Sequence, residues 1–456
     1  MGEGHRWWPG AALESGDCVT LENLLAALKA APGVAQWQIT ETMTVRHERY
    51  LTFLAVESER RAAATRWSIW LALASTDGKQ GEASFTLGSS EDTDALVERM
   101  RQALDAAASA TNPAWQLPAP GLPGTAIPPT DPAAGCDAGL LADPQQVLDG
   151  LVAEYTAAVT AAGPADVRPS TLELFATITD RRLLNHRGLD LRDRSTQLYA
   201  EFVLLHKPDA GAEVEFFDRA EATRANDLRL SARVTTAAAC VRDGAHAAKP
   251  TPGIQPVLIS DAYAAELIDY YAHHADAALH VRKVNALIEG APVLTRRSGD
   301  TLTLTSDPTV PSLAAYTFDP NGYAAVRQEL VRDDMLVGVH GSGRWMQVLG
   351  RTPRGARGTL VVPAGRTPLA QLRAGTLEVV RFSEFSPRSD TGAFSGEIRL
   401  AYLHHADGTR TAICGGSVSG VLKDALADAQ FSAEVVTVGD YHGPQAIRLA
   451  AVTVTA

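Results

Sequence analysis

The sequence predicts an α+β protein in which N-terminal α/β units precede a mainly antiparallel β domain. Up to about residue 220, amphipathic helical segments alternate with long strand-like segments. After residue 255, short apolar runs are separated by Gly and Pro, which is typical of antiparallel sheets. A segment rich in Pro and Gly separates two of the N-terminal units. We therefore expect four parts: an α/β unit at 1–110, a linker at 111–143, a second α/β unit at 144–219 and a β-rich domain at 220–456.

The first unit is expected to contain two helices around a set of strands. Residues 20–31 have the pattern of an amphipathic helix. Residues 91–109 form a second predicted helix, whose first residues are acidic and suit the positive end of the helix dipole. Between these helices, alternating apolar residues and turn signals such as TDGKQG predict four strands.

The second unit begins with a predicted helix at 144–162. Residues 167–219 then alternate between apolar and polar side chains around the turn NHRG, which indicates strands. Residues 218–246 have the pattern of one long amphipathic helix that ends at KPTPG. The β-rich domain follows, and its candidate strands lie in LTLTSD, DMLVGVHG, GTLVVPAG, TLEVVRFSEFS, GEIRLAYLHH, RTAICGGSVSG, AEVVTVGD and AIRLAAVTVTA.

Composition and charge exclude several classes of protein. Hydrophobic residues make up 45% of the 456 residues and charged residues 21%, which is ordinary for a soluble globular protein. The chain has neither an apolar run of about 20 residues nor a signal-peptide pattern at its start, so we expect a cytoplasmic protein without a membrane span. The net charge of −12 argues against binding to nucleic acid.

Short sequence motifs do not define a catalytic site. The four cysteines form no CxxC pair, and they predict neither a disulfide framework nor a local zinc site. GVHGSGRWM has Met346 where a dinucleotide fingerprint needs its third Gly. ICGGSVSG does not fit the G-x-S-x-G pattern of a nucleophile elbow. The glycines of both stretches are better explained by tight turns. The cysteines are Cys18, Cys136, Cys240 and Cys414.

One predicted helix contains the densest group of possible metal ligands. We expect it to run from Ala262 to about Val284, with Ser260 or Asp261 as its N-cap. Its stretch LIDYYAHHADAALH contains three of the twelve histidines of the chain and two aspartates.

Helix geometry limits what this group can bind. Asp269 and His273 share one face of the helix, and so do Asp276 and His280. His273 and His280 are seven residues apart, or roughly 10.5 Å along the axis, which is too far for one zinc ion with bonds of about 2.0–2.1 Å. A metal site would therefore use one Asp/His pair and further ligands from elsewhere. The alternative is a polar helix face that binds no metal.

Several longer motifs occur in a characteristic order. LLNHRGLDLRDRSTQLYAEF fits N-x-x-G-x-x-L-x-x-R-x-T, and LTLTSDPTVPSLAAYTFDPNG is similar to a D-D-P-x-x-P segment followed by an F-D-x-x-G turn. The stretch that includes SPRSDTGAFS is similar to S-x-x-x-P-x-T-G-x-F-S, and the C-terminal PQAIRLAAVTVTA resembles P-S-L-R-I-x-x-M-T-V-x-G. In this order and spacing, residues 143–456 resemble the TldD/PmbA (modulator of DNA gyrase) metallopeptidase family, in particular its PmbA-like (TldE) branch. Residues 15–110 match only in their pattern of elements.

The resemblance implies that this chain has no complete metal centre. Catalytic members of the family have H-E-x-x-x-H on the helix described above, with two His ligands and a Glu general base. Here Asp269, Tyr270 and His274 occupy these three positions. A Tyr with a pKa near ~10 is a poor general base at neutral pH. The cysteine ligand that such members have near the C-terminus is missing from VVTVGDYHGPQAIRL. Asp269 and His274 therefore remain only weak metal candidates, and no catalytic residue is assigned.

The resemblance also implies a partner. In such pairs one subunit holds zinc, and the other completes the assembly and the substrate channel. We expect this chain to form a heterodimer with a TldD-like metallopeptidase subunit that cleaves peptides. Ala393 replaces the usual Asp of T-G-D-F-S, and GEIRLAYL replaces a Gly-rich stretch after Ser395. An amide bond in a small-molecule conjugate of specialised metabolism is therefore an alternative substrate.

Two other functions remain open from the sequence. The chain is an enzyme in its own right if Asp269, His273, His274 and His280 form an atypical site. It is a binding or scaffold protein if it has no hydrolytic partner.

The stretch RFSEFSPRSDTGAFSGE is a candidate for the partner interface or for the mouth of the substrate channel. It is polar and rich in turns, yet it contains spaced aromatic residues, which are typical of interfaces. In the alternative interpretation, its three Phe fill the local core. The candidate interface residues are Arg381, Phe382, Phe385, Arg388 and Phe394.

Overall fold

The computed structural model of the protein has mixed helices and mostly antiparallel sheets, which confirms the predicted α+β class. In the described part of the chain, no helix is long and apolar enough to cross a membrane. The structure describes residues 17–74, 76–109, 111–126, 135–163, 166–209, 211–294 and 298–456.

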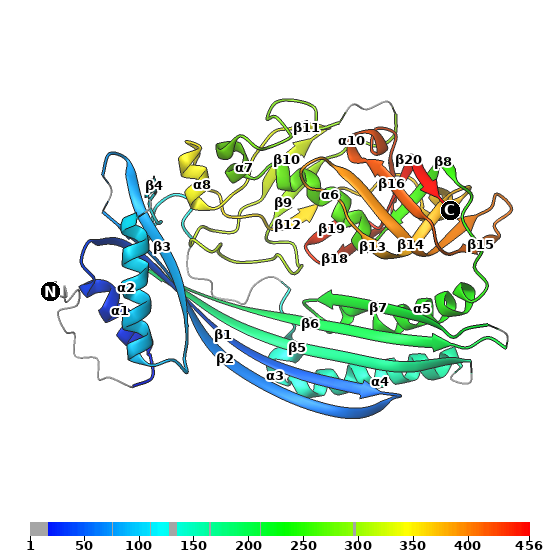
Figure 1. Ribbon diagram of the computed structural model, residues 1–456, viewed down its shortest axis with the longest axis horizontal. Helices are drawn as coiled ribbons and strands as arrows, with labels where there is room; N and C mark the ends of the chain where they lie inside the picture. Colours follow the sequence, from blue (N-terminus) through cyan, green and yellow to red (C-terminus); the bar gives the residue numbers. More distant parts are fainter. Residues whose placement is uncertain are drawn as a thin grey trace, which may run out of the picture.

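A long curved antiparallel sheet forms the N-terminal half (Figure 1). Its strand order is β4-β3-β2-β1-β5-β6-β7. The longest strands have 19 residues, which corresponds to roughly 60 Å at ~3.3 Å per residue. The bounds are β1 Val34–Thr52, β2 Ala55–Leu73, β3 Lys79–Gly88, β4 Thr111–Pro113, β5 Val167–Asn185, β6 Asp190–His206 and β7 Val214–Ala222.

The strands of the two expected α/β units share this one sheet. β1 pairs with β5 from Gln38 and Asn185 to Thr52 and Thr171, so the segments before and after the Pro/Gly-rich stretch lie side by side. The expectation of four strands between the first two helices was wrong, because three longer strands occupy this region. The β1–β2 turn consists of Phe53–Leu54, both with positive φ, and it has none of the Gly or Asn residues that usually indicate such a turn.

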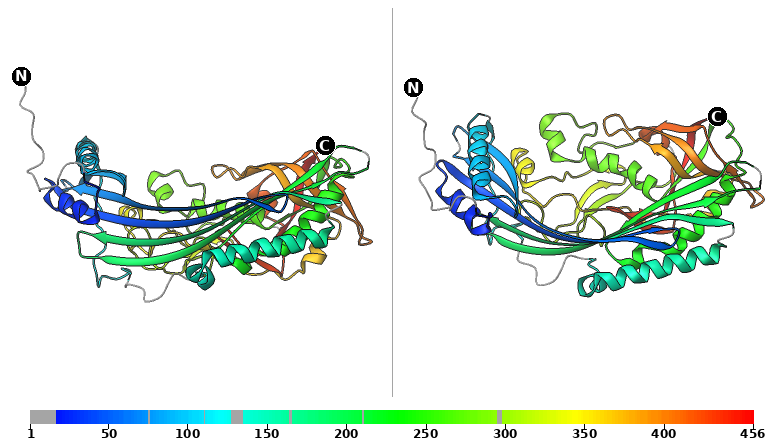
Figure 2. Two further views of the ribbon diagram at one scale, coloured as in Figure 1. Left: turned by 90° about the horizontal axis from the view of Figure 1, so that it is seen from below. Right: turned by 60° about the horizontal axis from the view of Figure 1, so that its bottom comes forward.

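Helices cover both ends of the sheet, and Figure 2 shows α4 lying along its length. α1 and α2 pack on strands β1–β3 through residues such as Ile39 and Leu96. α4 and α5 pack on strands β5 and β6 through residues such as Leu174 and Phe202. The first three predicted helices are confirmed within one or two residues. The bounds are α1 Leu21–Ala30, α2 Thr93–Ser109, α3 Ala138–Ala142, α4 Pro144–Ala162, η1 Ala225–Leu228 and α5 Leu230–Gly244.

The prediction of one long helix at 218–246 was wrong. Its first residues belong to β7, where Phe216, Asp218, Ala220 and Ala222 are buried while the residues between them are exposed. Period-two burial and pairing with β6 therefore determine the structure of this part. The predicted linker contains the short elements β4 and α3, and its residues 127–134 lie outside the described part.

The C-terminal half contains two further sheets. The six-stranded sheet has the order β11-β10-β9-β12-β19-β18. In the seven-stranded sheet the order is β13-β8-β20-β16-β14-β15, and a further β13–β14 pairing closes five strands into a ring. Only the β8–β13 and β12–β19 pairs are parallel among the described strands. This agrees with the predicted mainly antiparallel domain. The strands are β8 Gly253–Ser260, β9 Leu304–Asp307, β10 Gln328–Arg332, β11 Met335–Leu336, β12 Thr359–Val361, β13 Leu377–Phe385, β14 Ala393–His404, β15 Arg410–Ile413, β16 Ser417–Val421, β17 Gln430–Phe431, β18 Val435–Val438, β19 Tyr441–Pro444 and β20 Ala446–Thr455.

The helix that contains the histidines is broken into two. The Asp276 side chain accepts a hydrogen bond from the Ala278 backbone at 2.8 Å and begins a second helix. The backbone of His340 binds that of Ala275 at 3.0 Å and that of Ala277 at 2.8 Å, which holds the break open. The predicted single helix was therefore wrong, and Asp261 stands at the N-cap without a side-chain bond. The helices of this half are α6 Ala262–His274, α7 Ala277–Arg282, α8 Gly343–Val348, α9 Leu369–Arg373 and α10 Leu422–Ala425.

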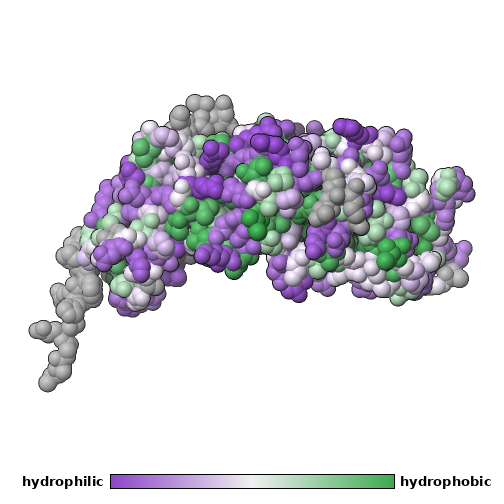
Figure 3. Space-filling view, turned by 90° about the horizontal axis from the view of Figure 1, so that it is seen from above, coloured by the Kyte–Doolittle hydropathy of each residue, from purple (hydrophilic) through white to green (hydrophobic). Residues whose placement is uncertain are grey.

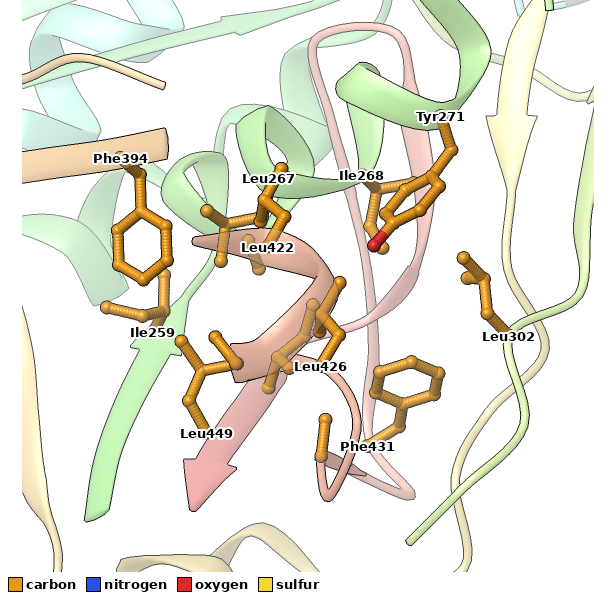
Figure 4. Close-up of a cluster of buried hydrophobic side chains, with 14 of the residues drawn as sticks. Ile259, Leu267, Ile268, Tyr271, Leu302, Phe394, Leu422, Leu426, Phe431 and Leu449 are labelled. Atoms are coloured by element: carbon orange, nitrogen blue, oxygen red, sulfur yellow. The ribbon is translucent and has the colours of Figure 1, made fainter. Parts of the chain in front are cut away.

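One face of α6 lies in the core of the C-terminal domain. Figure 4 shows Leu267, Ile268 and Tyr271 among side chains from β20 and α10, such as Leu449 and Leu422. All five side chains are buried. This packing fixes the rotation of α6 and determines which of its residues face away from the core.

Candidate functional site

The polar face of α6 is the candidate site. Glu266, Asp269, Tyr270 and His273 recur at the i, i+3, i+4 and i+7 positions of one helix face. None of them is fully buried, whereas the opposite face packs in the core. The sequence therefore places these four groups together through local helix geometry.

Asp269 is bound by an arginine. Arg357 donates from one guanidinium nitrogen to the Asp269 carboxylate and from the other to Asp440, the latter at 2.5 Å. Asp440 lies in the turn between β18 and β19, so Arg357 ties that turn to α6. A guanidinium held against the Asp269 carboxylate opposes a divalent cation at the same oxygens, because like charges repel.

His274 is a buried neutral side chain. It is 1% exposed, and its Nδ1 accepts a hydrogen bond from the Ala286 backbone at 3.0 Å. Burial lowers the pKa of His274 because it disfavours the charged ring, and the Ser389 backbone acts in the opposite direction. One ring nitrogen is therefore already used by the protein itself.

Two further histidines hold the end of α6. The Nε2 of His280 lies 3.0 Å from the His274 carbonyl, and the Nε2 of His340 lies 2.9 Å from the Ala272 carbonyl. The last carbonyls of a helix have no partner within the helix, so these side chains satisfy them. His280 thus has a structural contact, while His273 packs edge-on against His274 with ring centroids 5.2 Å apart.

The residues predicted for an atypical site do not form a ligand set. Over the described ranges, no three His, Cys, Asp or Glu side chains are grouped so that they could hold a metal ion. Asp269 is held by Arg357, and His274 and His280 hydrogen-bond the backbone. These residues do not fit a zinc ion in the arrangement found here.

Tyr270 packs against a turn of the candidate interface segment. Burial raises the pKa of Tyr270 above its usual value, so the phenol is protonated at neutral pH. A Cβ added to Gly392 would lie 3.2 Å from the Tyr270 ring, and Gly392 has a φ of +69°. Both the backbone conformation and the close approach therefore require glycine at this place. Tyr270 is a possible hydrogen-bond donor and not a base.

Glu266 was missed by the sequence reasoning. Burial raises the pKa of Glu266 to about 7, while the charge of Arg219 on β7 lowers it. The signal was present in the sequence, because Glu266 stands one helical turn before Asp269. Arg357 and Asp440 were missed as well. They lie 88 and 171 residues after Asp269, and no local pattern connects them to α6.

The candidate interface segment mostly packs within the chain. Phe382 and Phe394 are buried in the C-terminal core, and Phe385 stacks on Phe382 with ring centroids 4.7 Å apart. These contacts are the ones that the local-core alternative expects, and an interface role of the segment stays a prediction. Phe382 and Phe394 are not accessible on the surface, whereas Phe385 is partly exposed.

The two arginines of the segment have different environments. Arg381 lies 2.6 Å from Asp218 of β7 and so connects the C-terminal domain to the first sheet. Arg388 is exposed and lies 2.7 Å from Asp390. Arg388 and other exposed residues of the segment, such as Glu384 and Glu397, remain accessible for a role at an interface.

A cleft of about 350 Å³ opens beside Arg357, between the first sheet and the C-terminal domain. Arg181 of β5 donates to the Phe318 carbonyl at 2.6 Å in its wall and stacks over the Phe318 ring. The cleft is thus a contact region of the two halves next to the polar face of α6. Its lining includes Thr179, Arg181, Asp193, Tyr316, Phe318 and Arg357.

Exposed apolar side chains lie in separate groups. Figure 3 shows hydrophobic patches among hydrophilic surface on the face seen from above. A partner on that face would meet a mixed surface, as in many non-obligate interfaces. The large exposed hydrophobic residues are Met43, Phe53, Val56, Val97, Leu122, Phe217, Ile254, Val284, Ile288, Val337, Val421 and Val435.

Comparisons with known proteins agree with this architecture. Residues 252–456 match the model of the PmbA/TldA metallopeptidase C-terminal domain. The chain is similar to the crystal structure of TldE from Thermococcus kodakarensis, with a TM-score of 0.77 and 18% identity over 95% of this chain and 99% of that chain. The comparison with curated proteins gives no match.

Two proposed modulators of DNA gyrase have the same fold. The one from Bacteroides thetaiotaomicron has a TM-score of 0.74 and 18% identity over 95% of this chain and 97% of that chain. For the one from Thermotoga maritima, the TM-score is 0.74 and the identity 16% over 95% and 98% of the two chains. Residues 252–456 therefore belong to the PmbA/TldA metallopeptidase family through their C-terminal domain, and the chain as a whole has the fold of the TldE/PmbA structures.

Proposed function

We propose that this chain is the subunit without zinc in a heterodimeric amide hydrolase and that a TldD-like partner supplies the metal. In this role the chain completes the substrate channel of the partner. The family assignment and the similarity to a TldE structure support the proposal. Peptides are the proposed substrates, and an amide bond in a small-molecule conjugate is the alternative.

The contacts of α6 are the observation on which the proposal rests. Arg357 binds Asp269, which the sequence resemblance places at the first family histidine, and the protonated Tyr270 stands where the resemblance places the general base. Amide cleavage needs an activated water and a stabilised oxyanion, and a metal supplies both. A subunit whose equivalent positions are held in this way depends on a partner for that chemistry.

A cleavage assay tests the division of labour between the chains. This chain, a TldD-like partner encoded by a neighbouring gene and their mixture are each assayed on a peptide and on an amide conjugate, with chelator controls. We expect turnover only in the mixture. Asp269→Ala and Tyr270→Phe in this chain should leave the rate of the mixture within about threefold, a change below 1 kcal/mol. Chelator-sensitive turnover by this chain alone, at a rate that the partner does not raise, would contradict the proposal.

A second candidate function is supported by Glu266. A carboxyl group with a pKa of about 7 on the accessible face of α6 suits general acid–base work at neutral pH. In that case the chain is an enzyme in its own right. Glu266→Gln distinguishes the two functions, because it abolishes turnover by the single chain only if Glu266 is the catalytic group.

A further inference from the structure

The outer edge of β3 has no strand beside it over most of its length. β4 pairs with Lys79–Gly81 only, and β2 pairs with the other side of β3 as far as Gly88. Among the described strands, none pairs with the outer side beyond Gly81. Unpaired N–H and C=O groups of an edge strand are the groups that pair with another extended chain.

A cleft of about 830 Å³ borders this edge and extends over the adjoining sheet to Gln38 and Thr40 of β1 and to Pro320 and Asn321. Four consecutive β3 residues, 83–86, line the cleft, so both faces of the strand and therefore its edge border it. α2 forms the opposite wall through Arg99, Gln102 and Ala106, which recur at helical spacing. Figure 1 shows α2 alongside β3. The edge of β3 thus forms part of the lining of this groove, and α2 forms another part.

At one end of the groove, β3 and α2 are in close contact. A Cβ on Gly81 would lie 1.8 Å from the Ala107 carbonyl oxygen, so only glycine lets the end of α2 approach β3 this closely. The strand and the helix are therefore held together where β4 ends, and the groove extends from there toward Gly88.

Aromatic side chains border the same cleft. The rings of Trp70 and Trp115 lie 4.8 Å apart, and Trp70 is directly opposite Ser84 across the β2–β3 pair. Arg99 is the only charged residue in the described lining, and it lies 3.2 Å from Glu91. The groove therefore combines backbone hydrogen-bonding groups with aromatic side chains, and its one charged lining residue is paired with a residue of opposite charge.

We propose that this groove binds an extended, uncharged peptide segment that adds to β3 as a further strand. Backbone hydrogen bonds hold such a segment, and pockets for alternate side chains select it. A large apolar or aromatic side chain of the peptide packs against the Trp70 and Trp115 rings. A peptide of about five residues is long enough to pair with this edge, because the N–H and C=O groups that point outward recur at every second residue of an antiparallel edge strand. This binding role does not depend on the hydrolase function proposed above.

A fluorescence anisotropy titration on the full chain without its partner tests the proposal. The probe is a labelled, end-capped peptide of about five residues with a central Trp and no charged side chain. The control is the same peptide with alternate backbone amides N-methylated, which removes the donors that an edge strand needs. We expect the methylated peptide to bind at least tenfold more weakly. Hydrogen exchange at residues 83–87 should slow when the unmethylated peptide is added.

A matched pair of variants locates the binding site. Ala106→Trp fills the groove, whereas Ala108→Trp places the same side chain on the other side of α2, and both positions are exposed. Ala106→Trp should weaken peptide binding at least tenfold, and Ala108→Trp should bind like the unmodified chain. Equal binding by both variants or by both peptides overturns the proposal, and so does no binding at about 1 mM peptide.

A second copy of the chain is the competing occupant of the edge. If the chain self-associates and Ala106→Trp alone makes it monomeric, the groove holds another copy and the peptide proposal is overturned. Sedimentation of the unmodified chain and the two variants measures this. Loss of hydrolase activity plays no part in these measurements, so the hydrolase proposal and the groove proposal fail independently.

Discussion

Replacing Arg381 by Ala should weaken the contact between the C-terminal domain and the first sheet. The Arg381 guanidinium lies 2.6 Å from Asp218, and the two side chains are only 21% and 11% exposed. Removing one partner of a buried ion pair costs roughly 3–5 kcal/mol. Asp218 keeps a second partner, Arg233, at 3.0 Å. We therefore expect a smaller loss, about 2–3 kcal/mol in the free energy of unfolding.

Arg388→Ala is the matched control, because Arg388 belongs to the same segment. Arg388 and its partner Asp390 are 64% and 59% exposed, and exposed ion pairs contribute about 0–1 kcal/mol. Urea denaturation of the unmodified chain and both variants, followed by circular dichroism, measures the difference. Equal losses in the free energy of unfolding for Arg381→Ala and Arg388→Ala would refute the reasoning. It would also be refuted if Arg381→Ala left stability unchanged and weakened binding to the partner subunit, because Arg381 would then belong to the interface.

Three further results are expected. Gly81→Ala should cost about 1–3 kcal/mol in unfolding experiments through the overlap with Ala107, whereas Gly150→Ala on α4, with nothing near its Cβ, should not destabilise. Folding raises the pKa of Glu266 to about 7, so its contribution to stability is lost as pH rises from about 4.3 to that value. Urea titrations across this pH range should show a smaller fall in the free energy of unfolding for Glu266→Gln than for the unmodified chain. Elemental analysis of the chain should find no stoichiometric zinc, and a zinc ion lost in His274→Ala would disprove this.

Local signals were sufficient for several elements. The helix at 144–162 was predicted from its own residues, and Asp143 accepts hydrogen bonds from the backbone of Gln145 and Gln146 at its start. Such caps lie within a few residues of one another and are therefore visible in the sequence. The order of the family motifs likewise predicted the α+β class and the family, which the fold and the C-terminal domain confirm.

Long-range contacts decided the elements that were predicted wrongly. The start of the segment 218–246 has a helical pattern, yet it pairs with β6 as a strand. The helix after residue 261 has many good helix formers, such as its alanines, but the His340 backbone binds at Ala275 and Ala277 and breaks it. Intrinsic preferences amount to less than about 1 kcal/mol per residue, so tertiary contacts of this kind override them.

The sequence by itself determined the α+β class and the polar face of α6, because each depends on residues close together in the chain or on an ordered set of motifs. Tertiary structure alone decided which contacts the side chains of α6 make. Arg357 reaches Asp269 across 88 residues, and the Ala286 backbone occupies one nitrogen of His274. The groove beside β3 likewise depends on which strand lies at the sheet edge, and that order results from pairing between distant segments of the chain.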